Sequence, residues 1–207
     1  MKNNKKLIMF DFDGVLANTL DFSFRINKDM NEDFTWENLQ DLGKGNFHEE
    51  VRKLVEKEDY VIPHNFYDRY EEEIMKINIE DVLIETIKSL SKKYFLAIVS
   101  SSSSKYIKNF LKKEGVFEYF IEILGSDIHY SKTEKINGVL KRYNIFTEDA
   151  VFITDTLGDE LEASKSKVKS IGVTWGMHSK ETLKKGNPAV IVENPLNLSR
   201  VIKDVLK

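Results

Sequence analysis

The chain has 207 residues, of which 41% are hydrophobic and 31% charged, an ordinary composition for a globular protein. Its formal net charge of −3 argues against a large nucleic-acid interface, which requires a clustered basic face. Because the chain contains no cysteine, disulfides, thiolate metal sites and a cysteine nucleophile are excluded.

The N-terminal segment begins with basic residues and becomes apolar at Leu7–Phe10. A signal peptide would continue for about 7–15 apolar residues, whereas Asp11 and Asp13 interrupt this run at once. No stretch approaches the ~20 apolar residues of a membrane span. We therefore expect a cytoplasmic protein that neither crosses nor contacts a membrane.

Short apolar runs along the chain end in small or acidic residues and predict strands. Their near-continuous apolar character, without polar alternation, is typical of strands covered on both faces in a parallel sheet. The predicted strands are Leu7–Phe10, Phe95–Val99, Ile121–Leu124, Val151–Ile153, Ile171–Thr174 and Val190–Val192.

Amphipathic segments between these runs predict helices. Apolar residues such as Ile136, Val139 and Leu140 recur at helical spacing. Alternating strands and helices imply right-handed crossovers and an α/β fold with a doubly wound, Rossmann-like parallel sheet. The predicted helices of this part are Lys105–Glu114, Lys132–Tyr143, Asp159–Lys167 and Leu196–Leu206.

One region, from about Leu20 to Asp81, departs from this alternation. It is charged, aromatic and helical in pattern, and it shows no second strand–helix–strand unit. We expect a small helical cap domain at residues 19–82, inserted into an α/β core made of residues 1–18 and 83–207. Its predicted helices are Phe22–Met30, Thr35–Leu42, Phe47–Glu58 and Phe66–Ile77.

The first predicted strand ends in Asp11 and Asp13. In doubly wound sheets, ligands bind outside the carboxyl ends of the strands, near the topological switch point. Two carboxylates so close raise each other's pKa, and a divalent cation such as Mg²⁺ would relieve their repulsion. The plainer alternative is a strand that ends in solvated acids or in a turn at Gly14.

Later strand ends add further polar groups. Ser100 is placed to hold phosphoryl oxygens at a helix N-terminus, and Asp155 and Asp159 lie one helical turn apart. Lys132 opens a helix, against the preference of the helix dipole for negative charge there, which hints at another purpose for its charge. Lys135 is a competing candidate for that purpose. Taken singly, Ser100 is better explained as a helix cap, and acids at a helix N-terminus are common because of the helix dipole and need no metal.

Taken together and in this order, the set resembles the haloacid dehalogenase superfamily of hydrolases. The stretches that carry the resemblance are Asp11–Thr19, Asp155–Asp159, Gly172–His178 and Asn194–Pro195, of which the last two look like phosphoglycolate-phosphatase-like members. The chain departs from the family pattern in having Ser101 where many members have Asn, Thr154 where Gly is common, and no Pro after Lys132.

The resemblance implies a phosphatase for a small phosphorylated metabolite, with phosphoglycolate, sugar phosphates and nucleotides as candidates. Asp11 would be the nucleophile and Asp13 the general acid and base. Ser100, Ser101 and Lys132 would bind phosphate. The resemblance also implies that Mg²⁺ is bound by Asp11, Asp13 and Asp155, with Asp159 supporting the metal site from behind.

Rival functions share parts of this pattern. A phosphomutase or phosphonatase would keep the core, and a phosphonatase would need a lysine from the cap. A phospho-accepting signalling domain would have to use Asp127 as its acceptor. Four cap residues are possible specificity groups, although each is better explained as a surface charge: Arg25, Lys44, His48 and Arg69. The oligomeric state is not predicted.

Overall fold

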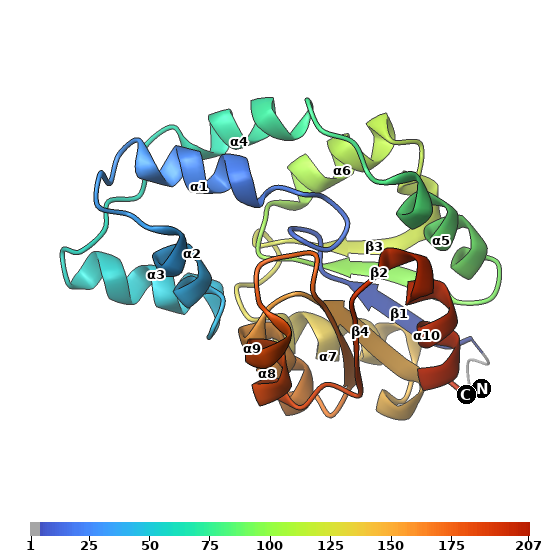
Figure 1. The fold of residues 1–207 in the computed structure, drawn as a ribbon. Coiled ribbons are helices and arrows are strands. Elements are labelled where there is room, and N and C mark those ends of the chain that lie inside the picture. Colours follow the sequence, from blue (N-terminus) through green and yellow to red (C-terminus); the bar gives the residue numbers. More distant parts are fainter. Residues whose placement is uncertain (1–4) are drawn as a thin grey trace.

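The computed structural model describes residues 5–207, which form a six-stranded parallel sheet between two layers of helices (Figure 1). The strand order is β3-β2-β1-β4-β5-β6, so the first strand is central and the chain winds outward in both directions. The predicted α/β fold class is confirmed. The strands are β1 (Leu7–Phe10), β2 (Phe95–Val99), β3 (Phe120–Leu124), β4 (Ala150–Thr154), β5 (Lys169–Val173) and β6 (Val190–Val192).

The central strand β1 explains the unbroken apolar runs of the sequence. Successive side chains of a strand point to opposite faces. In β1, Ile8 and Phe10 pack in one hydrophobic cluster, whereas Leu7 and Met9 pack in another, and all four are fully buried. Because helices cover both faces of the sheet, both sets of positions have to be apolar.

Helices cover both faces of the sheet, in one layer on each side (Figure 1). The first layer packs against the face that carries Ile8, and the second layer packs mainly against the face that carries Leu7. The first layer contains α5 (Asp81–Ser91), α6 (Ser104–Lys113) and α10 (Leu198–Val205). The second contains α7 (Lys132–Tyr143), α8 (Leu157–Lys165) and the short α9 (Lys180–Leu183).

Several predicted boundaries need correction. The helix predicted from Asp159 begins at Leu157, because Thr156 caps it by accepting a 3.3 Å hydrogen bond from the Asp159 amide. The helix predicted from Leu196 begins at Leu198, after a turn at Pro195–Asn197. Helices α5 and α9 were not predicted.

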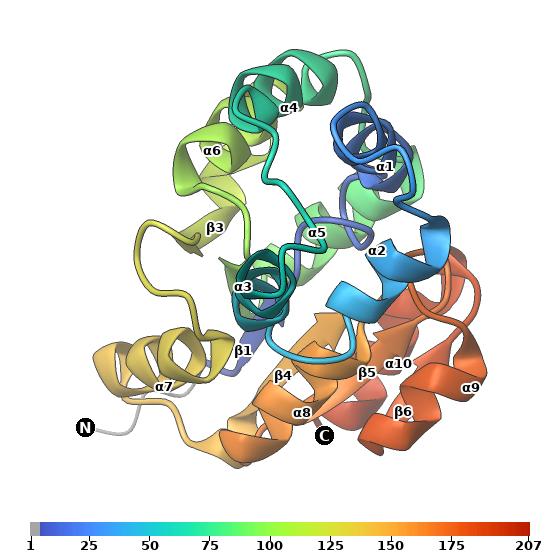
Figure 2. The ribbon, with the colours of Figure 1, turned by 90° about the vertical axis from the view of Figure 1, so that its left-hand side faces the viewer.

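The inserted segment folds into α1 (Leu20–Lys28), α2 (Trp36–Leu42), α3 (Phe47–Glu56) and α4 (Phe66–Ile74). Figure 2 shows α3 in front of the sheet, with α1 and α4 above it and α7 and α8 below. The predicted boundary at residue 83 falls inside α5, whose Leu83 and Ile87 pack in the sheet cluster. The division into a core and an inserted cap domain stays a prediction.

The helices are short. The longest between residues 5 and 207 is α7 with 12 residues, and none in this range has the length and apolarity that a bilayer crossing requires. The expected cytoplasmic location stays a prediction.

Candidate active site

Three neighbouring strands bring the predicted site residues to one edge of the sheet. Asp11 follows β1, Ser100 follows β2 and Asp155 follows β4, and β1 pairs in parallel with both of the other strands. Carboxyl ends of adjacent parallel strands meet at the same edge, so three residues far apart in sequence become neighbours. All three are buried.

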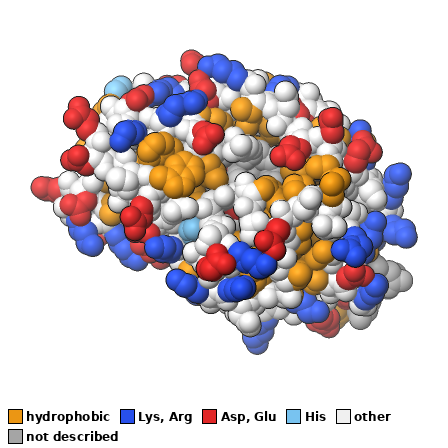
Figure 3. Space-filling view, viewed as in Figure 1, with side chains coloured by type: hydrophobic (Ala, Val, Ile, Leu, Met, Phe, Trp, Pro, Cys, Tyr) orange, Lys and Arg blue, Asp and Glu red, His pale blue; other side chains and the backbone are white. Residues whose placement is uncertain are grey.

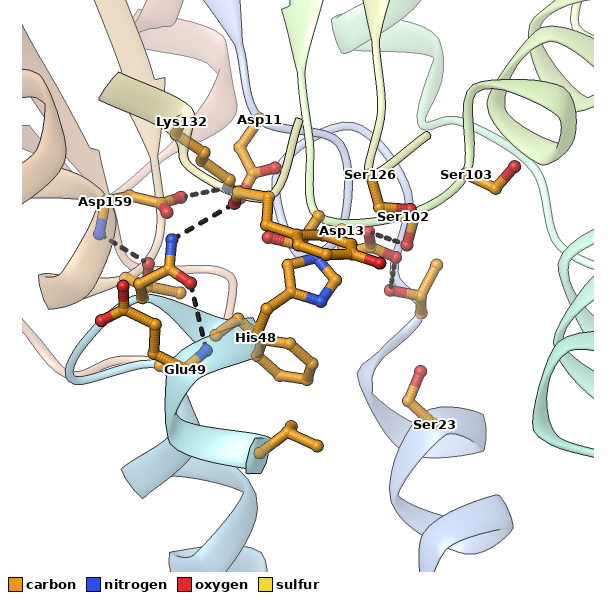
Figure 4. Close-up of a pocket in the computed structure, with 18 of the residues that line it drawn as sticks. Asp11, Asp13, Ser23, His48, Glu49, Ser102, Ser103, Ser126, Lys132 and Asp159 are labelled. Carbon is orange, nitrogen blue, oxygen red and sulfur yellow. Dashed lines mark hydrogen bonds and ion pairs between the residues drawn. The ribbon is translucent and has the colours of Figure 1, made fainter. Parts of the chain in front are cut away.

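A buried lysine joins two of the predicted carboxylates (Figure 4). The Lys132 Nζ lies 2.9 Å from Asp11 Oδ2 and 2.6 Å from Asp159 Oδ2. Thr154 Oγ1 donates a further hydrogen bond of 2.7 Å to the same Asp159 oxygen. The three charged groups therefore form one hydrogen-bonded unit that joins the end of β1 to the first turns of α7 and α8.

Burial sets the protonation behaviour of this unit. Burial raises the pKa of Asp11 well above its usual value, and the attraction of Lys132 only partly opposes this. For Asp159 burial acts in the same direction, but Lys132 and three hydrogen bonds outweigh it and lower its pKa. Burial would lower the pKa of Lys132, yet its two carboxylate partners raise it above the usual lysine value. Lys132 therefore stays charged.

Asp155 lies beside this unit in a confined pocket. Its Oδ2 accepts a 2.7 Å hydrogen bond from the Met177 amide, whereas its buried Oδ1 has no hydrogen-bond partner among the described residues. A side chain at Gly14 or Gly176 would collide with the Asp155 carboxylate, and Gly14 also has a positive φ of 71°. Burial raises the pKa of Asp155 to about 7.

The donor set fits a magnesium ion. A buried carboxylate oxygen without a partner is costly unless a cation or a donor satisfies it, and Asp155 Oδ1 is such an atom. Between residues 5 and 207, no three His, Asp or Glu side chains form a complete metal cage. Mg²⁺ does not require one, because it commonly binds one or two carboxylates and keeps several waters or phosphate oxygens.

Asp13 is held by hydroxyl groups from three parts of the chain. Its Oδ1 accepts hydrogen bonds from Thr19 Oγ1, at 2.7 Å, and from the Tyr70 hydroxyl of α4. Its Oδ2 accepts from Ser102 Oγ at 2.7 Å and from Ser100 Oγ at 3.4 Å. These hydrogen bonds fix both oxygens of the Asp13 carboxyl group at the cavity floor.

The serine run after β2 forms a loop over the same edge. Ser100 Oγ accepts a 2.9 Å hydrogen bond from the Ser102 amide, and Ser103 caps α6. Ser101 lines the cavity in front of the carboxylates.

The two candidate lysines occupy different places. Lys132 contacts Asp11, whereas Lys135 Nζ donates to the backbone carbonyl of Ser100 at 2.5 Å and to that of Gly125 at 3.4 Å. Burial, followed by the nearby charge of Lys132, lowers the pKa of Lys135 to about 8. Lys135 therefore braces the serine loop from behind, and only Lys132 lines the cavity.

Sequence reasoning missed two residues that contact Asp13. Tyr70 lies 57 positions along the chain from Asp13, on a helix that carries no motif, so no local pattern could have identified it. Ser102 lies in the serine run, two residues after Ser100, and that spacing was its only available signal.

A cavity of about 870 Å³ separates the strand ends from the inserted helices. Its floor carries Asp11, Asp13, Lys132, Asp155 and Asp159. Three of the possible specificity groups form ion pairs outside the cavity lining: Lys44 with Asp41, Arg25 with Glu73 and Arg69 with Asp29. The fourth, His48, lines the cavity and was wrongly expected as a surface residue; Figure 4 shows it reaching from α3 toward the floor.

The inserted helices touch the core through a glycine-lined seam. The Gly158 amide of α8 donates a 2.8 Å hydrogen bond to the carbonyl of Gly43, in the loop after α2. A side chain at Gly158 would collide with the carbonyl of Gly45. Gln40 reinforces the seam, because its side chain donates to the Met177 carbonyl at 2.9 Å and its carbonyl contacts His178 Nε2 at 2.8 Å.

Known sequences related to the chain include bacterial phosphatases. It is 25% identical over 122 residues to a phosphoglycolate phosphatase of Vibrio parahaemolyticus, a match that covers 57% of this chain and 54% of that protein. It is 33% identical over 103 residues to the Probable phosphatase IndB of Dickeya dadantii, covering 48% of this chain and 45% of that protein. In both comparisons the chain spans about half the length of the curated relative that it matches.

Solved structures share the whole fold. A hydrolase from Pseudomonas syringae superposes with a TM-score of 0.83 at 16% identity, covering 98% of this chain and all of that one. A haloacid dehalogenase-like hydrolase from Streptococcus pneumoniae superposes with a TM-score of 0.77 at 18% identity, covering 96% of this chain and 98% of that one. Residues 8–173 match the model of the haloacid dehalogenase-like hydrolases. The chain therefore belongs to the haloacid dehalogenase-like hydrolase family.

Proposed function

We propose that this protein is a Mg²⁺-dependent phosphatase that cleaves phosphate monoesters through an aspartyl phosphate formed on Asp11. One observation carries the proposal: the Asp11 carboxylate lies at a cavity floor, 2.9 Å from a buried lysine and beside Asp155, whose Oδ1 has no hydrogen-bond partner within residues 5–207. The names of the two sequence relatives, both phosphatases, support the same reaction class.

In the first half-reaction, a carboxylate oxygen of Asp11 attacks phosphorus in line with the ester oxygen. The new bond joins Asp11 to phosphorus, and the bond between phosphorus and the leaving oxygen breaks. Asp13, as the protonated acid, gives its proton to the departing alkoxide. The hydroxyls of Thr19, Ser102 and Tyr70 keep the Asp13 carboxyl in place.

In the second half-reaction, Asp13 acts as the base. It takes a proton from a water molecule, whose oxygen attacks the phosphorus of the aspartyl phosphate. The bond between phosphorus and the Asp11 oxygen breaks, phosphate leaves and the Asp11 carboxylate is restored. Asp13 is again protonated, so protons and charge balance over the cycle.

Lys132 compensates the charge of the phosphoryl group. Charge that is fixed in a buried site is worth more than charge in water, and the Asp159 and Thr154 contacts hold the ammonium group in position. Ser100 and Ser101, at the start of the serine loop, would bind the remaining phosphoryl oxygens. Sequence reasoning expected Asp159 to support the metal, whereas its contacts with Lys132 suggest that it orients the lysine.

Asp11, Asp155 and the backbone carbonyl of Asp13 would hold the magnesium ion. Mg²⁺ bound there would polarise the phosphoryl group and keep the buried carboxylates ionised. Lys132 alone does not keep Asp11 ionised, because burial still raises the pKa of Asp11.

The rival functions receive less support. A phosphonatase would need a cap lysine in the cavity, and Lys132 of the core is the only lysine lining it within residues 5–207. The signalling alternative would need Asp127 as acceptor, but its Oδ1 is engaged by the Ser104 amide at 2.7 Å.

The first test is hydrolysis of p-nitrophenyl phosphate by the purified chain. We expect activity that requires Mg²⁺, is lost on chelation and falls by at least about 10⁴-fold in Asp11→Asn. The control Asp33→Asn removes the same charge at an exposed position and should retain activity. Full activity in Asp11→Asn would exclude the aspartyl-phosphate mechanism.

A further inference from the structure

The part of the cavity that faces the inserted helices differs in chemistry from its floor. Its wall is built largely from aromatic and aliphatic side chains of α3, α4, α6 and the loops before α4 and α7. The aromatic members are Phe47, Tyr60, Phe66, Tyr67, Tyr106 and Tyr130. We call these six residues the aromatic wall.

Several apolar side chains along this cavity are left uncovered. Val55, Ile62, Tyr67 and Tyr130 line the cavity and are 39%, 52%, 55% and 65% exposed, respectively. Hydrophobic side chains also reach the surface over the inserted helices on the face shown in Figure 3. Contiguous exposed apolar side chains around a hollow commonly mark the binding site of an apolar group.

The aromatic wall begins at the catalytic floor itself. Tyr70, which donates to Asp13, is stacked on Phe66 with ring centroids 6.0 Å apart. Tyr67 is stacked on Tyr106 at 6.5 Å, and Tyr106 also lies 6.1 Å from Tyr70. A flat group attached to a phosphate on the floor would therefore meet ring faces and edges, the geometry that aromatic pairs favour.

The same wall lacks a buried positive charge. Arg52 is the only Lys or Arg that the inserted helices contribute to the cavity lining within residues 5–207, and its side chain is 69% exposed and 3.7 Å from Glu56. Burial, followed by the charge of Lys135, lowers the pKa of His48 to about 4, so His48 is neutral at pH 7. A carboxylate on the leaving group would lose its hydration without gaining a buried cationic partner.

We infer that the preferred substrates are phosphate monoesters whose alcohol is uncharged and carries an aromatic or other large apolar group, rather than a small carboxylated alcohol such as glycolate. This inference rests on the proposed function. The cavity volume of about 870 Å³ lies within the range of about 300–1,000 Å³ usual for sites that enclose drug-sized ligands, and far exceeds what a two-carbon acid fills.

The test compares three esters whose alkyl leaving groups are of similar kind: 2-phenylethyl phosphate, ethyl phosphate and phosphoglycolate. An aryl ester is avoided because its better leaving group would raise the rate without any binding preference. We expect kcat/KM for 2-phenylethyl phosphate to exceed that for both others by at least about tenfold, since burial of a phenyl ring supplies that factor readily.

Variants test whether the aromatic wall is the source of the expected preference for 2-phenylethyl phosphate. Tyr67→Ala removes a ring that faces the cavity, and we expect it to lower the ratio of 2-phenylethyl to ethyl phosphate by about fivefold or more. Leu196→Ala, at an exposed position outside the cavity lining, should leave the ratio unchanged. An unchanged ratio in Tyr67→Ala together with Phe66→Ala would overturn the assignment to the aromatic wall.

The outcomes separate this inference from the proposed function. Asp11-dependent hydrolysis with equal or better use of phosphoglycolate would overturn the inference and leave the phosphatase proposal intact. No Asp11-dependent hydrolysis of any ester would overturn the phosphatase proposal. Calorimetric binding of phenylphosphonate and methylphosphonate to the Asp11→Asn chain then tests the wall without catalysis: tighter binding of the phenyl compound supports it, and equal binding overturns it.

Discussion

The floor and the wall of the cavity enclose the same space with opposite chemistry. The floor consists of charged groups at strand ends and in the first turns of α7 and α8, and Lys132, Asp159 and Asp13 each have short hydrogen bonds that fix them. The wall consists of rings and aliphatic groups on α3, α4, α6 and neighbouring loops, several of them exposed. We therefore propose that the floor carries out the reaction, whereas the wall selects the group attached to the phosphate.

The two regions meet at few points. Tyr70 of α4 bonds to Asp13, and the loop that contains Gly43 lies on Gly158 at the start of α8. Such contacts couple the position of the inserted helices to Asp13, the proposed general acid, and to the shape of the cavity. Substitutions on each side of this seam therefore test whether the floor and the wall act separately.

The largest effect is expected on the floor, from Lys132→Met. Loss of the ammonium group leaves Asp11 and Asp159 buried without their cationic partner. We expect kcat/KM to fall by about 10³-fold and the free energy of unfolding to fall by about 3–5 kcal/mol. Steady-state kinetics and urea denaturation measure the two quantities.

Lys135→Met is the matched control for this change. Lys135 contacts backbone carbonyls rather than Asp11, so we expect a loss of activity of no more than about tenfold. Equal losses in the two variants would contradict the assignment of Lys132 as the phosphate-binding lysine.

The next effect concerns the seam, where Gly158→Ala places a methyl group against the Gly45 carbonyl. We expect the loop that contains Gly43 and Gly45 to be displaced. We also expect kcat/KM to fall by about 10- to 100-fold, because a shift of the inserted helices over the strand ends disturbs the geometry of the reacting groups. Gly138→Ala in α7 meets no atom within 4 Å and should keep full activity while gaining about 0.5–1 kcal/mol of stability. Retained activity in Gly158→Ala would show that the geometry of the active site does not depend on this contact.

A smaller effect is expected for Tyr70→Phe, which keeps the ring that stacks on Phe66 of the wall and removes the hydroxyl that bonds to Asp13. Hydrogen bonds to charged groups contribute about 1.5–3 kcal/mol, so we expect kcat to fall by about tenfold or more with little change in KM. Tyr106→Phe, whose ring lies 6.1 Å from Tyr70, is the control. A change confined to KM would assign Tyr70 to the wall alone.

The smallest effect tests a buried acid that faces away from the cavity. Glu160 is fully buried, its Oε1 has no hydrogen-bond partner among the described residues, and burial raises its pKa to about 8 despite a hydrogen bond from Ser170. Between pH 4.5 and about 8 the unfolded chain therefore binds fewer protons than the folded one. The free energy of unfolding falls as pH rises through this window.

Glu160→Gln cannot ionise, so this pH dependence should disappear. We expect the variant to be more stable than the parent by about 1–3 kcal/mol at pH 8 and nearly equal to it at pH 4.5. Urea denaturation at the two pH values measures the difference. A lower stability of the variant at pH 8 would mean that the charged form of Glu160 is compensated in the folded protein.

The sequence by itself determined the parallel sheet and the placement of Asp11, Ser100 and Asp155 at one edge. Buried strands of a parallel sheet need apolar side chains on both faces, and their carboxyl ends share one edge. Both constraints act locally on the chain, and so they are visible in residue order. The inserted position of the helical segment was visible for the same reason, because it interrupts the alternation of strand and helix.

Only the tertiary structure distinguished the contacts of Lys132, which reaches Asp11, from those of Lys135, which lies on the same helix nearly one turn away. It also revealed the contacts of Tyr70 and His48 and the rings of the aromatic wall. These depend on how the inserted helices pack over the strand ends, through contacts between residues far apart in sequence. Packing is non-directional and spread over many weak contacts, so it leaves no short motif from which such neighbours could be predicted.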